Sequence, residues 1–151
     1  MGKKITKIRW NYNDKKPSYE INMQIDLSRF DRQYSDAQKK LDSIVMTDMV
    51  PYMPRQTGTF INVTKAMSAS LAGTGKVVAA APPMGRFLYH GKVMVDEVTK
   101  SPWARKGAKK VVTDKDLKYF NPKATPFWFD TAKNKHGKSW IKQVKKIAGG
   151  G

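Results

Sequence analysis

Residues 28–54 read SRFDRQYSDAQKKLDSIVMTDMVPYMP, and this stretch decides the fold that we expect. Its apolar residues recur at spacings of four and three, which places them along one face of a helix; they are Phe30, Tyr34, Ala37, Leu41, Ile44 and Val45. Ser28 and Asp31 match a helix-capping pattern, and Pro51 and Pro54 end the helix. The stretch predicts one long amphipathic helix over residues 28–52 that packs on its own domain's sheet, with partner binding by the stripe as the alternative.

Strand-like patterns lie on both sides of this helix. Before it, apolar and polar residues alternate on either side of a turn-forming segment, residues 13–17, which predicts a hairpin within residues 8–27. After it, residues 67–71 and 76–81 flank Ala72-Gly73-Thr74-Gly75, which predicts a second hairpin. Residues 60–66 fit either a short helix or a strand. The two hairpins predict an antiparallel β-sheet.

The C-terminal half predicts an arm and a second helix. Residues 97–123 are rich in lysine and poor in apolar anchors, so we expect a long basic loop or arm with a short strand at 110–113. Apolar residues then recur at helical spacing, with His136-Gly137 as a break before the helix; they are Trp140, Ile141, Val144 and Ile147. The expected fold class is α+β, with one domain over residues 1–148 and a flexible tail at 149–151.

Positive charge is unevenly distributed along the 151 residues. The chain carries 29 Lys+Arg against 12 Asp+Glu, a formal charge of +17, and no acidic residue lies between Asp48 and Asp96. Such segregation indicates either a polyanionic partner or solubility by self-repulsion. The candidate contacts to nucleic acid or a partner are Lys100, Arg105, Lys106, Lys109, Lys110, Lys115, Lys118 and Lys123, with Trp103, Tyr119 and Phe120 among them. They would touch phosphates without reading bases; the alternative is a solvated surface loop.

The sequence does not argue for a phosphate loop or for thiol chemistry. The chain has no cysteine, which excludes disulfides, thiolate metal sites and thiol nucleophiles. Gly73-Thr74-Gly75-Lys76 lacks two residues that a phosphate loop needs, because Ser70 replaces the first glycine and Val77 follows the lysine. We therefore expect a hairpin turn at this glycine pair.

Other catalytic patterns are equally weak. His90 and His136 lie in unrelated segments, and we expect His90 to pack near Tyr89. Asp116-Leu117-Lys118 has the spacing of a nuclease metal-binding strand, so a small basic nuclease is one functional hypothesis, the weakest of those considered. We expect no catalytic residue, no metal and no cofactor. No apolar run approaches the ~20 residues of a membrane span, so we expect a soluble, intracellular protein without membrane contacts.

Three segments, and the order in which they occur, resemble those of the neck proteins of tailed bacteriophages. Their residues are most similar to those of minor capsid proteins of phages that infect Gram-positive bacteria. The segments are Met53-Pro54-Arg55-Gln56-Thr57-Gly58-Thr59-Phe60, Ala81-Pro82-Pro83-Met84-Gly85-Arg86-Phe87-Leu88-Tyr89-His90-Gly91, and Pro126-Phe127-Trp128-Phe129-Asp130-Thr131-Ala132. The resemblance covers about residues 28–148. His90 stands where the wider family often has a glutamate. The matching positions, expected to be structural, are Pro54, Thr57, Gly58, Phe87, Tyr89, Gly91, Pro126 and Phe127.

The resemblance implies a head-tail connector subunit of the tail-completion type, with no enzymatic activity. Such proteins form a ring that joins the capsid to the tail, with double-stranded DNA in the lumen and portal, neck or tail proteins as neighbours. Six copies per ring are expected, with twelve as the alternative, in a virion assembled in the bacterial cytoplasm. A ring needs two complementary patches per subunit, here the neutral helix and the acid-free middle. A stand-alone basic nucleic-acid-binding protein is the main alternative.

Overall fold

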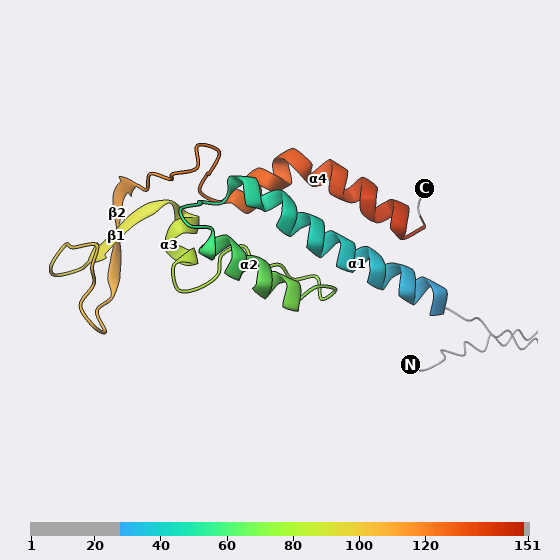
Figure 1. Ribbon diagram of the computed structural model, residues 1–151, viewed down its shortest axis with the longest axis horizontal. Helices are drawn as coiled ribbons and strands as arrows, with labels where there is room; N and C mark the ends of the chain where they lie inside the picture. Colours follow the sequence, from blue (N-terminus) through green and yellow to red (C-terminus); the bar gives the residue numbers. More distant parts are fainter. Residues whose placement is uncertain (1–27, 150–151) are drawn as a thin grey trace, which may run out of the picture.

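The structure is a computed structural model that describes residues 28–149. Its elements are α1 (Ser28–Met49), the 3-10 helix η1 (Val50–Tyr52), α2 (Thr59–Ser70), α3 (Gly85–His90), β1 (Lys92–Asp96), β2 (Lys110–Asp116) and α4 (Trp128–Ile147). The helices α1 and α4 lie side by side and run in opposite directions, while β1 and β2 project from one end of the helical body (Figure 1). The α+β class is as expected. The hairpin expected within residues 8–27 and the end of the expected tail lie outside the described residues.

Helix α1 forms where the apolar spacing predicts it. Its buried side includes Ala37, Val45 and Met49, whereas Phe30 and Tyr34 at the start of the stripe are exposed. Pro51 lies in η1, where a missing backbone N–H is tolerated at the start of a new helical turn. Met53 leaves the helix with extended angles, φ −82° and ψ 146°, because the residue before a proline is driven out of the helical region.

Helix α4 is longer than expected and runs through His136 and Gly137, so the predicted break there is wrong. A glycine inside a helix costs about 1 kcal/mol relative to alanine. That cost is offset by tertiary packing on both sides of it, since Ala132 and Trp140 are both buried. His136 also contacts the rest of the domain, with its Nε2 3.2 Å from the Tyr52 hydroxyl oxygen.

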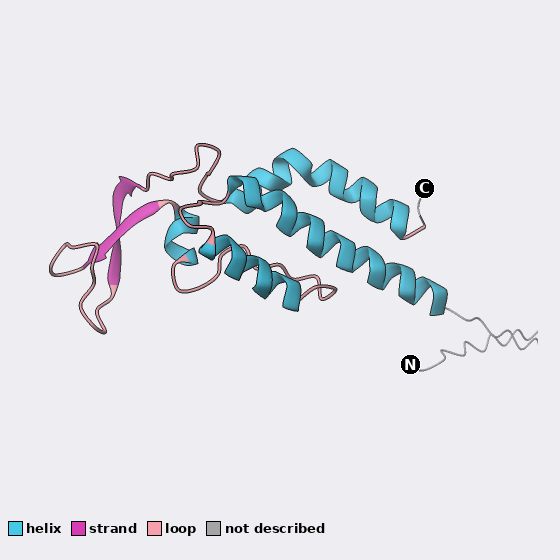
Figure 2. Ribbon diagram, in the orientation of Figure 1, coloured by secondary structure: helices cyan, strands magenta, loops and turns pink. Residues whose placement is uncertain are grey.

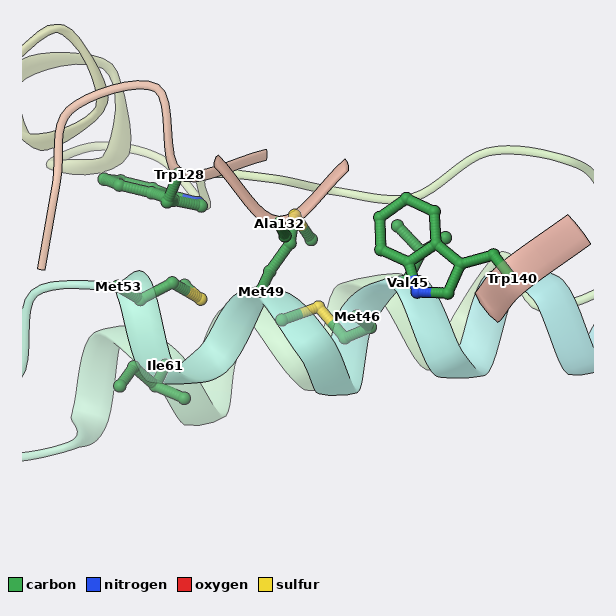
Figure 3. Close-up of a cluster of buried hydrophobic side chains, with 8 residues drawn as sticks. All are labelled: Val45, Met46, Met49, Met53, Ile61, Trp128, Ala132 and Trp140. Atoms are coloured by element: carbon green, nitrogen blue, oxygen red, sulfur yellow. The ribbon is translucent and has the colours of Figure 1, made fainter. Parts of the chain in front are cut away.

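The hydrophobic core lies between α1 and α4, with one contribution from α2 (Figure 3). It consists of Val45, Met46, Met49, Met53, Ile61, Trp128, Ala132 and Trp140. Both core indoles have polar partners, as buried tryptophans usually do. Trp128 Nε1 donates to the Ala79 carbonyl oxygen at 2.8 Å, and Trp140 Nε1 donates to Asp48 Oδ2 at 2.6 Å. These two bonds connect α4 to the segment after α2 and to α1.

The hairpin predicted over residues 67–81 is wrong. Residues 67–70 form the last turn of α2, and the segment that follows it is a loop and not a strand (Figure 2). Backbone groups of this segment pair with side chains of α2. The Ser68 hydroxyl bonds both the N–H and the carbonyl of Val78, each at 3.0 Å. The Ala81 N–H donates to the Thr64 hydroxyl at 3.2 Å. Because α2 supplies these partners, an extended segment satisfies its backbone here without a sheet.

The strands β1 and β2 form an antiparallel pair, the one sheet within residues 28–149. Met94 pairs with Val112, Val95 with Val111 and Asp96 with Lys110. The register is irregular between Lys92 and Met94. The strand expected at 110–113 therefore exists and continues to Asp116, while residues 97–109 form the loop that joins the two strands.

Candidate partner and nucleic-acid interface

The second and third neck-protein-like segments meet where the strand pair joins the helical body. The Phe127 N–H donates to the Tyr89 carbonyl oxygen at 2.9 Å, and the two rings contact edge to face with centroids 5.4 Å apart. Gly91 has φ +66°, and a Cβ there would lie 2.7 Å from Pro126 Cβ. A glycine is therefore required on both conformational and steric grounds. Burial raises the pKa of Tyr89, and the nearby Asp130 carboxylate adds to this increase.

The first such segment lies at the surface beside this junction. Pro54, Thr57 and Gly58 line a hollow of about 320 Å³ between the start of α2, residues 81–84 and residues 118–120. Leu88 of the second segment also lines the hollow, so the first and second segments are neighbours there. Its carbonyl oxygen accepts a 2.6 Å hydrogen bond from the Tyr119 hydroxyl. Burial raises the pKa of Tyr119. All three segments thus converge on one region of the fold.

The hollow and its surroundings are suited to binding a partner. Exposed apolar side chains line it, namely Val63, Met84 and Phe120. Among the described residues that line it, the charged ones are Arg55 and Lys118, both basic. Apolar contact with a basic rim favours a protein surface that carries acidic groups. The hollow is therefore part of the acid-free patch expected from the sequence.

A larger apolar groove of about 620 Å³ lies between α1, α4 and residues 75–79. Leu41, Val77 and Ile141 are among its apolar lining residues, and Lys133 and Lys145 lie at its α4 side. The α1 stripe packs mostly within its own domain, as expected, but among the described residues its partner is α4 and not the strand pair. The part of the stripe that this packing leaves uncovered is the start of α1.

The predicted contact residues are distributed along the strand pair and its flanks rather than gathered in one cluster. Lys100, Lys106, Lys109, Lys115, Lys118 and Lys123 are exposed. Two others have structural contacts. The Lys110 ammonium lies 5.3 Å from the centroid of the Phe87 ring, and the Arg105 guanidinium binds Asp96. The six exposed lysines are therefore the ones that remain available to a polyanion.

One buried carboxylate organises the loop at the tip of the strand pair. Asp96 accepts hydrogen bonds from the backbone N–H groups of Val98, Thr99 and Arg105 at 2.8 to 3.1 Å. The Arg105 side chain donates to it from Nε at 3.1 Å and from Nη2 at 3.3 Å. The arginine, followed by these amides, holds the pKa of Asp96 well below its usual range. The loop is thus preorganised, and it presents Trp103 with 86% of the side chain exposed.

A second basic surface lies on α4, and its residues are not among the contacts predicted from the sequence. We call it the α4 lysine face; it consists of the exposed residues Lys138, Lys142, Lys145 and Lys146. Spacings of three and four bring most of them to one side of α4. The signal was present in the sequence, because no acidic residue follows Asp130. This face is the more uniform candidate for contact with phosphates.

The glycine pair that suggested a turn is bound to α1. The N–H groups of Gly73 and Gly75 donate to Asp42 Oδ2 at 2.7 and 3.2 Å, and Gln38 Nε2 donates to Oδ1 at 2.8 Å. The hairpin turn expected here is therefore a loop fastened to a carboxylate. The amides that a phosphate loop would use already have an acceptor.

The remaining candidate groups also have contacts of their own. His90 packs edge to face on Tyr89, as expected, with centroids 6.1 Å apart. Asp116 forms an ion pair with Lys92, with Oδ1 and Nζ 2.5 Å apart. Within residues 28–149, no three His, Asp or Glu side chains come together in a way that could hold a metal ion. None of the described helices is long and apolar enough to cross a bilayer.

The fold and these surfaces define a small α+β protein with an antiparallel helix pair, a projecting strand pair and two basic surfaces. Comparisons with protein-family models, with curated proteins and with solved structures found no match to this chain. Function must therefore be inferred from the residues themselves.

Proposed function

We propose that the chain is a structural subunit of a bacteriophage neck, which forms a ring around the DNA channel between capsid and tail. The observation that carries the proposal is the convergence of the three neck-protein-like segments. They are separated in sequence, yet Gly58, Tyr89 and Phe127 belong to one continuous region of the fold. Gly91 in the second segment supports the proposal, because its positive φ and the 2.7 Å approach to Pro126 Cβ of the third segment require a glycine there.

The surfaces are compatible with such a ring. Closed cyclic assembly needs two different patches on each subunit. Residues 28–54 are neutral, with four basic and four acidic residues, whereas the hollow has a basic rim. The α4 lysine face would contact lumenal DNA without sequence specificity. Six subunits per ring are proposed, with twelve as the alternative, together with neighbouring portal, neck or tail proteins and a location in the virion.

The experiment is a deletion of the gene in the phage that encodes the chain, followed by electron microscopy of the lysate. We expect DNA-filled heads and free tails that do not join, and recovery of tailed particles when the wild-type chain is supplied in trans. Normal tailed particles from the deletion would rule out this function.

A stand-alone nucleic-acid-binding protein is the second candidate, and the α4 lysine face is the observation that favours it. Such a protein should bind duplex DNA as a monomer, with an affinity that falls steeply as salt rises. A connector subunit should bind weakly as a monomer and gain affinity when many copies act together. A salt titration of DNA binding, measured on separated monomers and assemblies, distinguishes the two.

A further inference from the structure

Each end of the described chain exposes large apolar side chains. At one end, the loop between β1 and β2 presents Trp103, 86% exposed, and Val98, 68% exposed. At the other end, the first turns of α1 present Phe30, 53% exposed, and Tyr34, 65% exposed. Figure 1 shows the strand pair and the start of α1 at opposite ends of the described chain. Large exposed apolar side chains of this kind mark interaction surfaces.

The first of these surfaces is the hairpin tip, defined by Val98, Lys100, Trp103, Lys106 and Lys109. The three lysines are exposed, and Asp96 is bound by Arg105 and the loop amides. Glu97 is also exposed in this loop, but the three lysines outnumber it, so the tip is positive overall. The same hydrogen bonds fix the loop before any partner arrives. Preorganisation lowers the entropy lost on binding, and tryptophan is the residue type most often found as an energetic anchor at interfaces.

The second surface is the α1 start, defined by Phe30, Asp31 and Tyr34. Asp31 is exposed and lies three residues before Tyr34, so it shares that side of the helix. Arg29 and Arg32 are also exposed in this turn, but at helical spacing both fall on the side of the helix away from Tyr34, so Asp31 is the charged residue of the turn nearest to that ring. The α1 start thus offers a carboxylate and two aromatic faces, and both kinds of group attract lysine ammonium groups.

We propose that the hairpin tip of one copy docks on the α1 start of the next copy, head to tail. The proposal rests on the proposed function, because it names a contact between neighbouring subunits; in this contact the start of the neutral helix meets the loop of the strand pair instead of the hollow. The two surfaces are different and lie at opposite ends, so the contact is heterologous and each copy can make it twice. Trp103 is the anchor, and the tip lysines set its orientation against Asp31.

The test uses the full chain and two variants, each with one surface disabled. Trp103→Ala removes the anchor and leaves the α1 start intact, while a Phe30→Ala/Tyr34→Ala double variant does the reverse. Each variant alone should be monomeric by native mass spectrometry, with the midpoint concentration for assembly raised at least about 30-fold, as expected for an anchor residue. Mixed, the two variants should form heterodimers with the mass of two 17.1 kDa chains and stop there. Val112→Ala, an exposed position on β2 away from the tip, should assemble as the wild type does.

Two further measurements make the outcomes distinct. Circular dichroism of each variant checks the fold, which should be unchanged because all three side chains are exposed. A photo-crosslinking residue at position 103 of the otherwise wild-type chain should crosslink to residues 28–36 of another copy. Wild-type assembly by both variants, or a mixture that stays monomeric, overturns the contact and leaves the ring proposal standing. If the variants behave as expected but the wild type forms open chains, the contact stands and the ring is wrong.

Discussion

Replacing Asp42 with alanine should destabilise the protein, because its carboxylate connects α1 to the loop after α2. Asp42 is 5% exposed and accepts three hydrogen bonds, from the N–H groups of Gly73 and Gly75 and from the Gln38 amide. Alanine would leave these donors without their acceptor in a partly buried place. The loop is the connection between α2 and the extended segment that bonds the Trp128 indole, so its loss should also loosen the core.

The magnitude follows from the two backbone amides. A buried donor that loses its partner costs about 1 to 3 kcal/mol. Relaxation of the loop toward water should recover part of that cost, so we expect a loss of about 2 to 4 kcal/mol in the free energy of unfolding for Asp42→Ala. Asp42→Asn is the matched control. Its carbonyl oxygen can accept from both glycine amides and its NH₂ group can donate to Gln38 after that side chain flips, so it should lose less than about 1 kcal/mol.

The assay is urea unfolding followed by tryptophan fluorescence, with the slope against urea compared between variants to check that the unfolded states match. Fluorescence is suitable because Trp128 and Trp140 are buried in the core and Trp140 lines the same groove as Asp42. Equal stability of the alanine and asparagine variants would refute the reasoning, because it would mean that the glycine amides do not depend on an acceptor at this position.

Three other predictions address the junction, the tip and the lysines. Gly91→Ala should cost about 2 to 4 kcal/mol in unfolding free energy, from left-handed strain plus overlap, whereas Gly107→Ala, with φ +76° and open space around it, should cost about 1 kcal/mol; equal losses would contradict the packing at the junction. Because the folded pKa of Asp96 is depressed, its stabilisation is complete above about pH 4 and declines as pH falls below that; the wild-type urea midpoint should drop there relative to Asp96→Asn, and parallel curves would count against the tip network. Glutamine at all four positions of the α4 lysine face should reduce the slope of log binding constant against log salt for duplex DNA by about 3 to 4, and an unchanged slope would place the DNA contact elsewhere.

The sequence predicted the two long helices because their evidence is periodic. Both stripes follow helical spacing and both contribute to the buried interior, through Ala37 and Val45 in the first and Trp140 in the second, whereas Ile141 of the second stripe is exposed. The exposed start of the first stripe could not be foreseen, because spacing shows which residues share a face but not how far the opposing helix extends. The break placed at Gly137 failed for a related reason: local propensity was outweighed by packing on either side.

The connections between helices were harder to predict because their partners are distant in sequence. The segment after α2 looked like a strand, but its backbone bonds Thr64 and Ser68 side chains, and nothing local distinguishes that arrangement from a ladder. The carboxylates of Asp42 and Asp96 likewise act on groups that only the folded chain brings near. The α4 lysine face is visible in the sequence as an acid-free run after Asp130, but only the folded helix shows that most of its lysines share one side. The sequence could not show that the three neck-protein-like segments lie close together, because they are far apart along the chain and only the fold brings them near.

Cryo-electron microscopy of virions from the genome that encodes this chain would show whether the protein forms a ring in the neck. We expect a closed ring of identical copies between portal and tail, with α1 and α4 of each subunit recognisable in the density and the α4 lysine face turned toward DNA. A neck fully explained by other proteins, or purified virions that lack this chain, would contradict it.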